Sequence, residues 1–189
     1  MSYRVLMMCQ QDIAQVTEID REAFPTMMPP ANFLRELRSS LAYYIVAYDD
    51  EKTIDELESE KTGHYIVGFA GFWVMAGEAH MVNIAVRQSY RRWGIGELLL
   101  ISLIDLAIEL KAYFITLEVR ASNIAAQSLY YKYGFALKGL RRSYYSDDKE
   151  DAVIMTLENI DSAPFQEQLN RLKQAHSRKW GAPLYQVAR

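Results

Sequence analysis

The sequence of 189 residues contains a single cysteine, Cys9, so an intramolecular disulfide is excluded. A lone cysteine suits a reducing compartment, and we expect a cytoplasmic protein. We interpret Cys9 as a small apolar residue of the first strand. No histidine lies near Cys9 in the sequence, which argues against a thiol nucleophile.

Histidines and excess charge are also scarce. The three histidines, His64, His80 and His176, have no cysteine or carboxylate partners at the sequence spacing of metal ligands, so we predict no metal site. The formal net charge is only −3, which gives no electrostatic reason to bind a phosphate backbone. Direct binding of nucleic acid is therefore not expected.

Long apolar runs are missing as well. The longest one, Leu98 to Ile108, is interrupted by Ser102 and Asp105. It is much shorter than the roughly 20 residues that a membrane-spanning helix needs. The start of the chain lacks a charged leader followed by an apolar run. We expect neither a membrane span nor a signal peptide.

The residues that are present predict one mixed α/β catalytic domain over 1–158 and an extension over 159–189. Half of the residues are hydrophobic and 24% are charged, which is typical of a globular chain. Hydrophobic periodicity and turn residues predict helices at 12–24, 32–37, 94–111 and 123–133. They predict strands at 43–48, 65–75, 80–86, 114–119, 136–145 and 152–157. The polar segment 49–61 is interpreted as a solvated hairpin loop.

The extension is predicted to form an amphipathic helix, because apolar residues recur in it at helical spacing: Phe165, Leu169, Leu172 and Ala175. The apolar face has two interpretations. It packs on the catalytic domain, or it contacts a partner or a second copy in a homodimer.

A glycine-rich turn joins a predicted strand to the longest predicted helix. It reads Arg91-Arg92-Trp93-Gly94-Ile95-Gly96. Glycines there let successive amides converge on one point, where the positive end of the helix dipole favours an anion such as a pyrophosphate. The turn has neither the Lys-Ser/Thr of a P-loop nor the third glycine of the dinucleotide fingerprint. By itself it is equally typical of a tight turn.

The residues around this turn resemble the GNAT (Gcn5-related N-acetyltransferase) superfamily. Val82-Asn83-Ile84-Ala85-Val86 followed by Arg-x-x-Gly-x-Gly is similar to its acetyl-CoA-binding motif. Four further segments resemble the RimI-type subfamily, which acetylates the N-terminal α-amine of a ribosomal protein: Leu117 to Asn123, Leu129 to Phe135, Arg141 to Tyr145 and Glu150 to Ala152. The resemblance implies acetyl-CoA as co-substrate. It also implies the GNAT fold, a mixed and mostly antiparallel sheet splayed at the CoA site with helices on both faces.

The resemblance assigns the cofactor-binding residues. The pyrophosphate would be held by backbone amides of the turn: Arg91, Arg92, Trp93, Gly94, Ile95, Gly96 and Glu97. The backbone of Ile84, Ala85 and Val86 would pair with the pantetheine arm like an added strand. Asn123 would bond the pantetheine from the start of the next helix, although it also has the character of a helix N-cap.

The resemblance implies Glu118 as general base, acting through a water, and Tyr130 as the acid that protonates the departing sulfur. Direct transfer in a ternary complex follows, without an acyl-enzyme. A carboxylate in the apolar strand that holds Glu118 is costly unless it is paired or hydrated, so a buried ion pair with an arginine is the alternative. For Tyr130 the alternative is a tyrosine of the core. Asn123 and Tyr130 are seven residues apart, about two helical turns, and so share one helix face.

The acceptor residues are also assigned by resemblance: Phe24 and Pro25 in the loop 24–30, and Tyr144 with Tyr145. The alternative for the tyrosines is a hairpin with surface aromatics. Pro25 is followed by Thr-Met-Met-Pro-Pro, where the RimI pattern has Trp-Ser, and the chain is about 30 residues longer at its end. Both departures place the ribosomal acceptor in question. A small-molecule amine acetyltransferase, a non-catalytic CoA sensor and an interaction protein remain as alternatives.

Overall fold

The computed structural model describes residues 3–26, 31–54, 63–182 and 184–186. Strands and helices alternate along these residues. The strands are β1 (Tyr3–Met7), β2 (Ala42–Ile54), β3 (Gly63–Met75), β4 (Glu78–Val86), β5 (Phe114–Arg120), β6 (Ala136–Arg141), β7 (Ala152–Glu158) and β8 (Leu184–Gln186). The α-helices are α1 (Ile13–Ala23), α2 (Phe33–Arg38), α3 (Ile95–Glu109), α4 (Ile124–Lys132) and α5 (Ala163–Trp180), and 3-10 turns precede α1 and α3.

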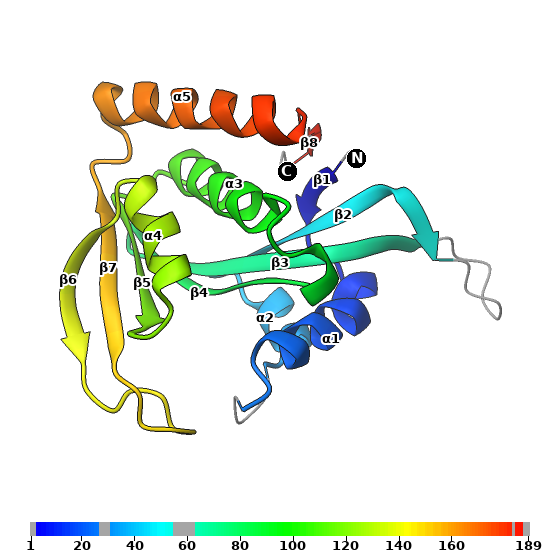
Figure 1. The fold of residues 1–189 in the computed structure, drawn as a ribbon, viewed down its shortest axis with the longest axis horizontal. Coiled ribbons are helices and arrows are strands. Elements are labelled where there is room, and N and C mark those ends of the chain that lie inside the picture. The colour runs from blue at the N-terminus through cyan, green and yellow to red at the C-terminus, as the bar shows by residue number, and fades with distance from the viewer. Residues whose placement is uncertain (1–2, 27–30, 55–62, 183, 187–189) are drawn as a thin grey trace.

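The strands form one central sheet (Figure 1). In the described residues it has eight strands in the order β6-β7-β5-β4-β3-β2-β1-β8. The pairs β4–β5 and β1–β8 are parallel, and the other neighbours are antiparallel. Helices α3, α4 and α5 lie on one face, and α1 and α2 lie on the other. The expected mixed, mostly antiparallel sheet with helices on both faces is confirmed.

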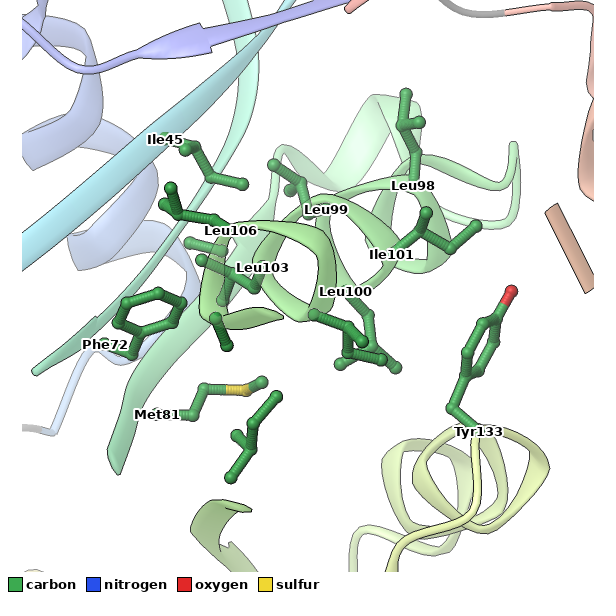
Figure 2. Packing of buried hydrophobic residues seen from close by; sticks show 14 of the residues in the cluster. Ile45, Phe72, Met81, Leu98, Leu99, Leu100, Ile101, Leu103, Leu106 and Tyr133 are labelled. Atoms are coloured by element: carbon green, nitrogen blue, oxygen red, sulfur yellow. The ribbon is translucent and has the colours of Figure 1, made fainter. Parts of the chain in front are cut away.

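Helix α3 is the centre of the main core (Figure 2). Its sequence is apolar nearly all round, and ten of its fifteen residues are buried. Leu99 and Leu103 of α3 pack with Ile45 and Phe72 of the sheet in one cluster. A helix with apolar residues on every side must be covered on every side. The sheet covers one side of α3, and Leu169 of α5 joins the same cluster.

A second, smaller core lies between the sheet and helices α1 and α2. Ile19 of α1 and Phe33 of α2 are buried there. The Phe33 ring packs edge-on against Tyr44 and Phe69, at centroid distances of 5.7 and 5.4 Å. Such edge-to-face pairs add about 0.5–1.5 kcal/mol beyond the area they bury. Helix α1 precedes the candidate acceptor loop 24–30 and helix α2 follows it, so both helices that flank this loop are fixed on the sheet.

The polar segment 49–61 was expected as a loop, and for residues 49–54 that prediction is wrong. Strand β2 continues through Ile54, paired with β3. Asp49 is buried and accepts a 3.1 Å hydrogen bond from the Tyr90 hydroxyl. The Lys52 ammonium lies over the rings of Tyr65 and Tyr90. These distant aromatic partners stabilise polar residues in a strand, while residues 55–62 lie outside the described part of the chain.

Two predictions for the ends of the chain also need correction. Strand β1 ends at Met7, and Cys9 is exposed before the 3-10 turn, where its amide donates to Asp12. The extension forms the expected amphipathic helix α5, but it continues into strand β8, which pairs with β1. Within the described residues, no helix is long and apolar enough to cross a membrane.

Candidate active site

Strands β4 and β5 separate at the middle of the sheet. Their parallel pairing runs from Glu78–Phe114 to Met81–Leu117 in the described strands. Immediately afterwards β4 carries a bulge, because Gly71 pairs with Asn83 and the next residue of β3, Phe72, pairs with Met81. A bulge bends its strand and increases the local twist. The backbone of residues 84–86 therefore follows β3 away from β5, which leaves the geometry that an added pantetheine strand requires.

The glycine-rich turn follows β4 directly and ends at the N-terminus of α3. Arg92 and Gly94 both have left-handed backbone conformations, with φ of 66° and 77°. Arg91 before them is extended, and Ile95 after Gly94 begins the right-handed helix. A left-handed residue next to a right-handed one turns consecutive amides toward a common point, which is the backbone geometry of an anion-binding nest. Gly94 is the N-cap of α3, and the amides that follow lack acceptors within the helix. This arrangement suits a pyrophosphate and fits the predicted role of residues 91–97.

The Glu97 side chain is bound by helix α4. Its carboxylate contacts Lys132 Nζ at 2.5 Å and accepts a hydrogen bond from the Tyr133 hydroxyl at 2.6 Å. Burial acts to raise the pKa of Glu97, but the bonds from Lys132 and Tyr133 outweigh it and the pKa is lowered. The negative charge nearest to the anion-binding turn is therefore neutralised by α4.

Asn123 is the N-cap of α4. Its Oδ1 accepts a hydrogen bond from the Ala126 amide at 3.1 Å. The alternative role of Asn123, that of a helix N-cap, is therefore observed. The predicted bond from Asn123 to pantetheine stays a prediction.

Glu118 of β5 forms a charged cluster with two neighbouring strands. Its side chain is only 8% exposed, and its carboxylate contacts His80 Nε2 of β4 at 2.6 Å and Arg141 Nη2 of β6 at 3.1 Å. The alternative of an ion pair with an arginine is thus observed. Both partners are about half exposed, so water is able to reach the paired carboxylate, and a paired carboxylate is still able to accept a proton. Its role as base stays a prediction.

His80 was not identified as a site residue from the sequence. Its partner Glu118 is 38 positions away in the sequence, yet the parallel register places His80 beside Thr116, two residues before Glu118. Successive side chains of a strand alternate between faces, so Thr116 and Glu118 share the face that His80 occupies. The register of β4 on β5 was the missing information. No cluster of three metal-ligand side chains occurs in the described residues.

Tyr130 of α4 lies on the other face of the sheet, in the main core with Leu117 and Val119. It is buried, and its ring centroid is 5.6 Å from that of Phe135. Burial raises the pKa of Tyr130, and the nearby Tyr145 adds to the effect. The phenol therefore stays protonated at neutral pH, as a proton donor must. Its surroundings also fit the alternative of a core tyrosine.

Tyr145 connects the two candidate catalytic groups. Its pKa is raised to about 12, mainly by burial, although the Arg120 cation opposes the shift. Tyr145 interacts electrostatically with both Glu118 and Tyr130. These three residues come from β5, α4 and the loop after β6, so the fold brings Tyr145 near both candidate groups.

The loop 142–151 is folded around Arg120. The guanidinium at the end of β5 binds Asp147 at 2.7 Å, Asp148 at 2.9 Å and Glu150 at 3.0 Å. It also lies 3.9 Å from the centroid of the Tyr145 ring. Arg120 was not assigned a function from the sequence, because its partners are about thirty residues away.

The predicted strand 136–145 is wrong beyond Arg141. Ser143 adopts a left-handed conformation with φ of 50°, and its amide donates to Asp151 instead of a neighbouring strand. Tyr144 is 45% exposed and packs edge-on against Tyr145 at 5.3 Å. Tyr144 therefore fits the alternative of a surface aromatic on a hairpin, whereas Tyr145 is half-buried, and the acceptor role of both stays a prediction.

The two predicted acceptor segments meet in the structure. The Thr26 hydroxyl donates a hydrogen bond to the Asp147 carboxylate, which connects the chain after α1 to the loop after β6. Phe24 is half-buried against the smaller core and Pro25 is exposed. Residues 27–30 of the predicted acceptor loop lie outside the described part of the chain.

Comparison with known proteins identifies a family that this chain resembles. The family model described as "Acetyltransferase (GNAT) family" matches residues 13–135. A Bacillus subtilis (strain 168) protein, provisionally named a [ribosomal protein bS18]-alanine N-acetyltransferase, is 37% identical over 146 residues, which are 77% of this chain and 88% of that protein.

Solved structures agree with the sequence match. The ribosomal-protein-S18-alanine N-acetyltransferase from Escherichia coli superposes with a TM-score of 0.67 at 29% identity, covering 82% of this chain and 93% of that one. NAA60 of Arabidopsis thaliana in complex with acetyl-CoA has a TM-score of 0.72 at 16% identity, covering 84% and 99%, and at that identity it supports the fold alone.

Proposed function

This chain belongs to the acetyltransferase (GNAT) family, and we propose that its acceptor is the N-terminal α-amine of a protein. It is an N-acetyltransferase that uses acetyl-CoA. The observation that carries the proposal is the opening between β4 and β5. The glycine-rich turn follows β4 directly, and Glu118 lies on β5 one residue beyond the last β4–β5 pair. Tyr145 interacts electrostatically with Glu118 and with Tyr130.

The proposed mechanism is direct transfer in a ternary complex. Acetyl-CoA supplies an acetyl thioester whose carbonyl carbon is attacked by the free amine. Glu118, through a water, removes the proton that the amine must lose, and Tyr130 protonates the sulfur as the carbon–sulfur bond breaks. Proton exchange with solvent then restores both side chains. Neither step needs a covalent acyl-enzyme.

A peptide acceptor is supported by the aromatic groups at the rim. Tyr144 and Tyr145 pack against each other in the loop 142–151, and the Thr26–Asp147 hydrogen bond joins this loop to the chain that leaves α1. Tyrosine hydroxyls are able to bond extended backbone without selecting particular side chains. A ribosomal protein that begins with alanine is the acceptor class that the relatives' names suggest. A homodimer and a cytoplasmic location belong to the same proposal.

The test measures free thiol release from acetyl-CoA across short peptides that begin with Ala, Ser, Met or Thr. A peptide with a blocked N-terminus and one whose only free amine is on lysine serve as controls. We expect release only with a free α-amine, fastest for alanine. Release with small amines and with none of the peptides would favour a small-molecule acetyltransferase, and CoA binding without any turnover would favour a sensor.

A further inference from the structure

Helix α5 is fixed lengthwise on α3 (Figure 1). Ser162 caps its N-terminus, and Leu169 is buried in the main core. The Lys173 ammonium contacts Asp105 of α3 at 2.5 Å. Two independent contacts, one apolar and one charged, therefore set the position of the last turns of α5 relative to α3.

The last turns of α5 reach the glycine-rich turn. His176 is 5% exposed, and its Nε2 lies 2.9 Å from the carbonyl oxygen of Gly94. The Trp180 ring packs directly on Gly94, since a Cβ placed on that glycine would lie 2.6 Å from the indole. Gly94 is therefore enclosed by two side chains of the extension.

The hydrogen bond to His176 has a defined direction. A carbonyl oxygen only accepts, so Nε2 carries the proton. Nδ1 of the same ring is buried and has no hydrogen-bond partner among the residues that the structure describes. The same Gly94 oxygen also accepts from the Leu98 amide at 2.9 Å, the first bond of α3.

Fixing the Gly94 carbonyl fixes the next amide as well. The peptide unit is planar and trans, so its C=O and N–H point in opposite directions. A carbonyl held toward α5 and Leu98 therefore directs the Ile95 N–H to the opposite side, where the amides of the turn converge. Without these contacts, Gly94 at φ of 77° would be free to explore other conformations.

We infer that His176 and Trp180 are positioning residues for the acetyl-CoA pyrophosphate site, so that the C-terminal extension belongs to the cofactor-binding apparatus. The inference rests on the proposed assignment of the turn to pyrophosphate. The extension lies outside the family match, which ends at residue 135. It supplies no group to the acetyl transfer itself, so its effect falls on cofactor affinity.

The experiment compares His176→Ala, His176→Gln and Trp180→Ala in the full chain. Glutamine keeps an N–H donor near the place of Nε2. Arg171→Ala is the matched control, since Arg171 is on α5 but 78% exposed and paired only with Glu167 in the described residues. Steady-state kinetics give kcat and KM for acetyl-CoA, isothermal calorimetry gives the Kd for CoA, and thermal unfolding checks the fold.

Loss of one buried hydrogen bond to the turn is expected to raise KM and Kd for the cofactor about five- to tenfold in His176→Ala. The kcat and the peptide KM remain unchanged, His176→Gln recovers most of the affinity, and Arg171→Ala matches the wild type. Trp180→Ala is expected to weaken CoA binding similarly.

Cofactor affinity that stays at the wild-type level in both folded variants, His176→Ala and Trp180→Ala, would overturn the inference and leave the proposed acetyl transfer intact. Weaker CoA binding in the two variants, together with a wild type that binds CoA but acetylates no amine, would support the inference while refuting the proposed acceptor. A wild-type chain that does not bind CoA would overturn both.

Discussion

Replacing Glu118 by glutamine separates its proposed catalytic role from its structural role. The substitution keeps the shape of a side chain that is 8% exposed and removes its charge. Its partners His80 and Arg141 have side chains that are 48% and 53% exposed, so water is able to solvate both cations. The cost to folding is therefore expected to be about 1 kcal/mol or less. Loss of a general base lowers kcat by about 10²- to 10⁴-fold, which is roughly 3–5 kcal/mol in the barrier.

The measurement is peptide-dependent thiol release at saturating acetyl-CoA. Glu158→Gln is the control, since Glu158 of β7 also pairs with a cation, Lys138 at 2.8 Å, but is 53% exposed and lies beside Phe114 at the start of β5. We expect Glu118→Gln to lose kcat with little change in KM for acetyl-CoA, and Glu158→Gln to keep both. A kcat for Glu118→Gln within about threefold of wild type would refute the assignment, because general-base catalysis contributes far more than that.

Three further predictions follow from the same structure. Tyr130→Phe keeps the packed ring and removes the protonated hydroxyl, so kcat in the thiol-release assay is expected to fall about 10- to 100-fold. The thermal unfolding temperature stays unchanged. A kcat equal to that of the wild type would make Tyr130 a core tyrosine without a catalytic role. Leu169→Ala opens a cavity between α5 and the core and lowers the free energy of unfolding by about 2–5 kcal/mol in urea titration. The pKa of Asp147 is lowered mainly by its bond to Arg120, and that of Glu150 mainly by Ser122. These two carboxylates therefore stabilise the loop 142–151 fully above the ordinary carboxyl pKa of about 4, and the stabilisation is lost as the pH falls through their lowered pKa values. Hydrogen exchange of the loop amides as a function of pH measures this loss.

The elements of the fold follow closely from local sequence signals. Helix α3 was predictable because its apolar run is bounded by Gly94 and by polar residues, and α4 because Asn123 and Gly134 mark its two ends. Such signals act within a few residues and need no knowledge of the tertiary structure. The class of sheet and its splayed centre came from family resemblance, since hydrophobic periodicity does not specify strand order.

Long-range contacts explain the errors. Residues 49–54 have the composition of a loop, and they form a strand because Asp49 meets Tyr90, 41 positions later. The loop after β6 has the aromatic residues of a strand, but side-chain acceptors from the following segment capture its amides. The partner is 41 positions away in the first case and eight in the second, and in both cases a side-chain contact outweighed local preference.

The candidate site shows the same division. Glu118 and Tyr130 were named from the motifs that contain them, but their neighbours were not. His80 reaches Glu118 only through the register of two parallel strands, and Arg120 organises a loop that begins more than twenty residues later. The partners of a catalytic side chain are set by which strands are adjacent, and a single sequence does not contain that information.

The C-terminal extension shows how much of the structure an amphipathic pattern predicts. Its apolar stripe predicts that α5 packs on something, and the structure places that stripe on the main core through Leu169. The domain boundary after residue 158 stays a prediction, while α5 contacts α3 and β8 pairs with β1. A chain cut at 158 would therefore lose the cover of α3 and a strand of the sheet together with His176 at the glycine-rich turn. For that reason point substitutions test the cofactor role of the extension more cleanly than its deletion does.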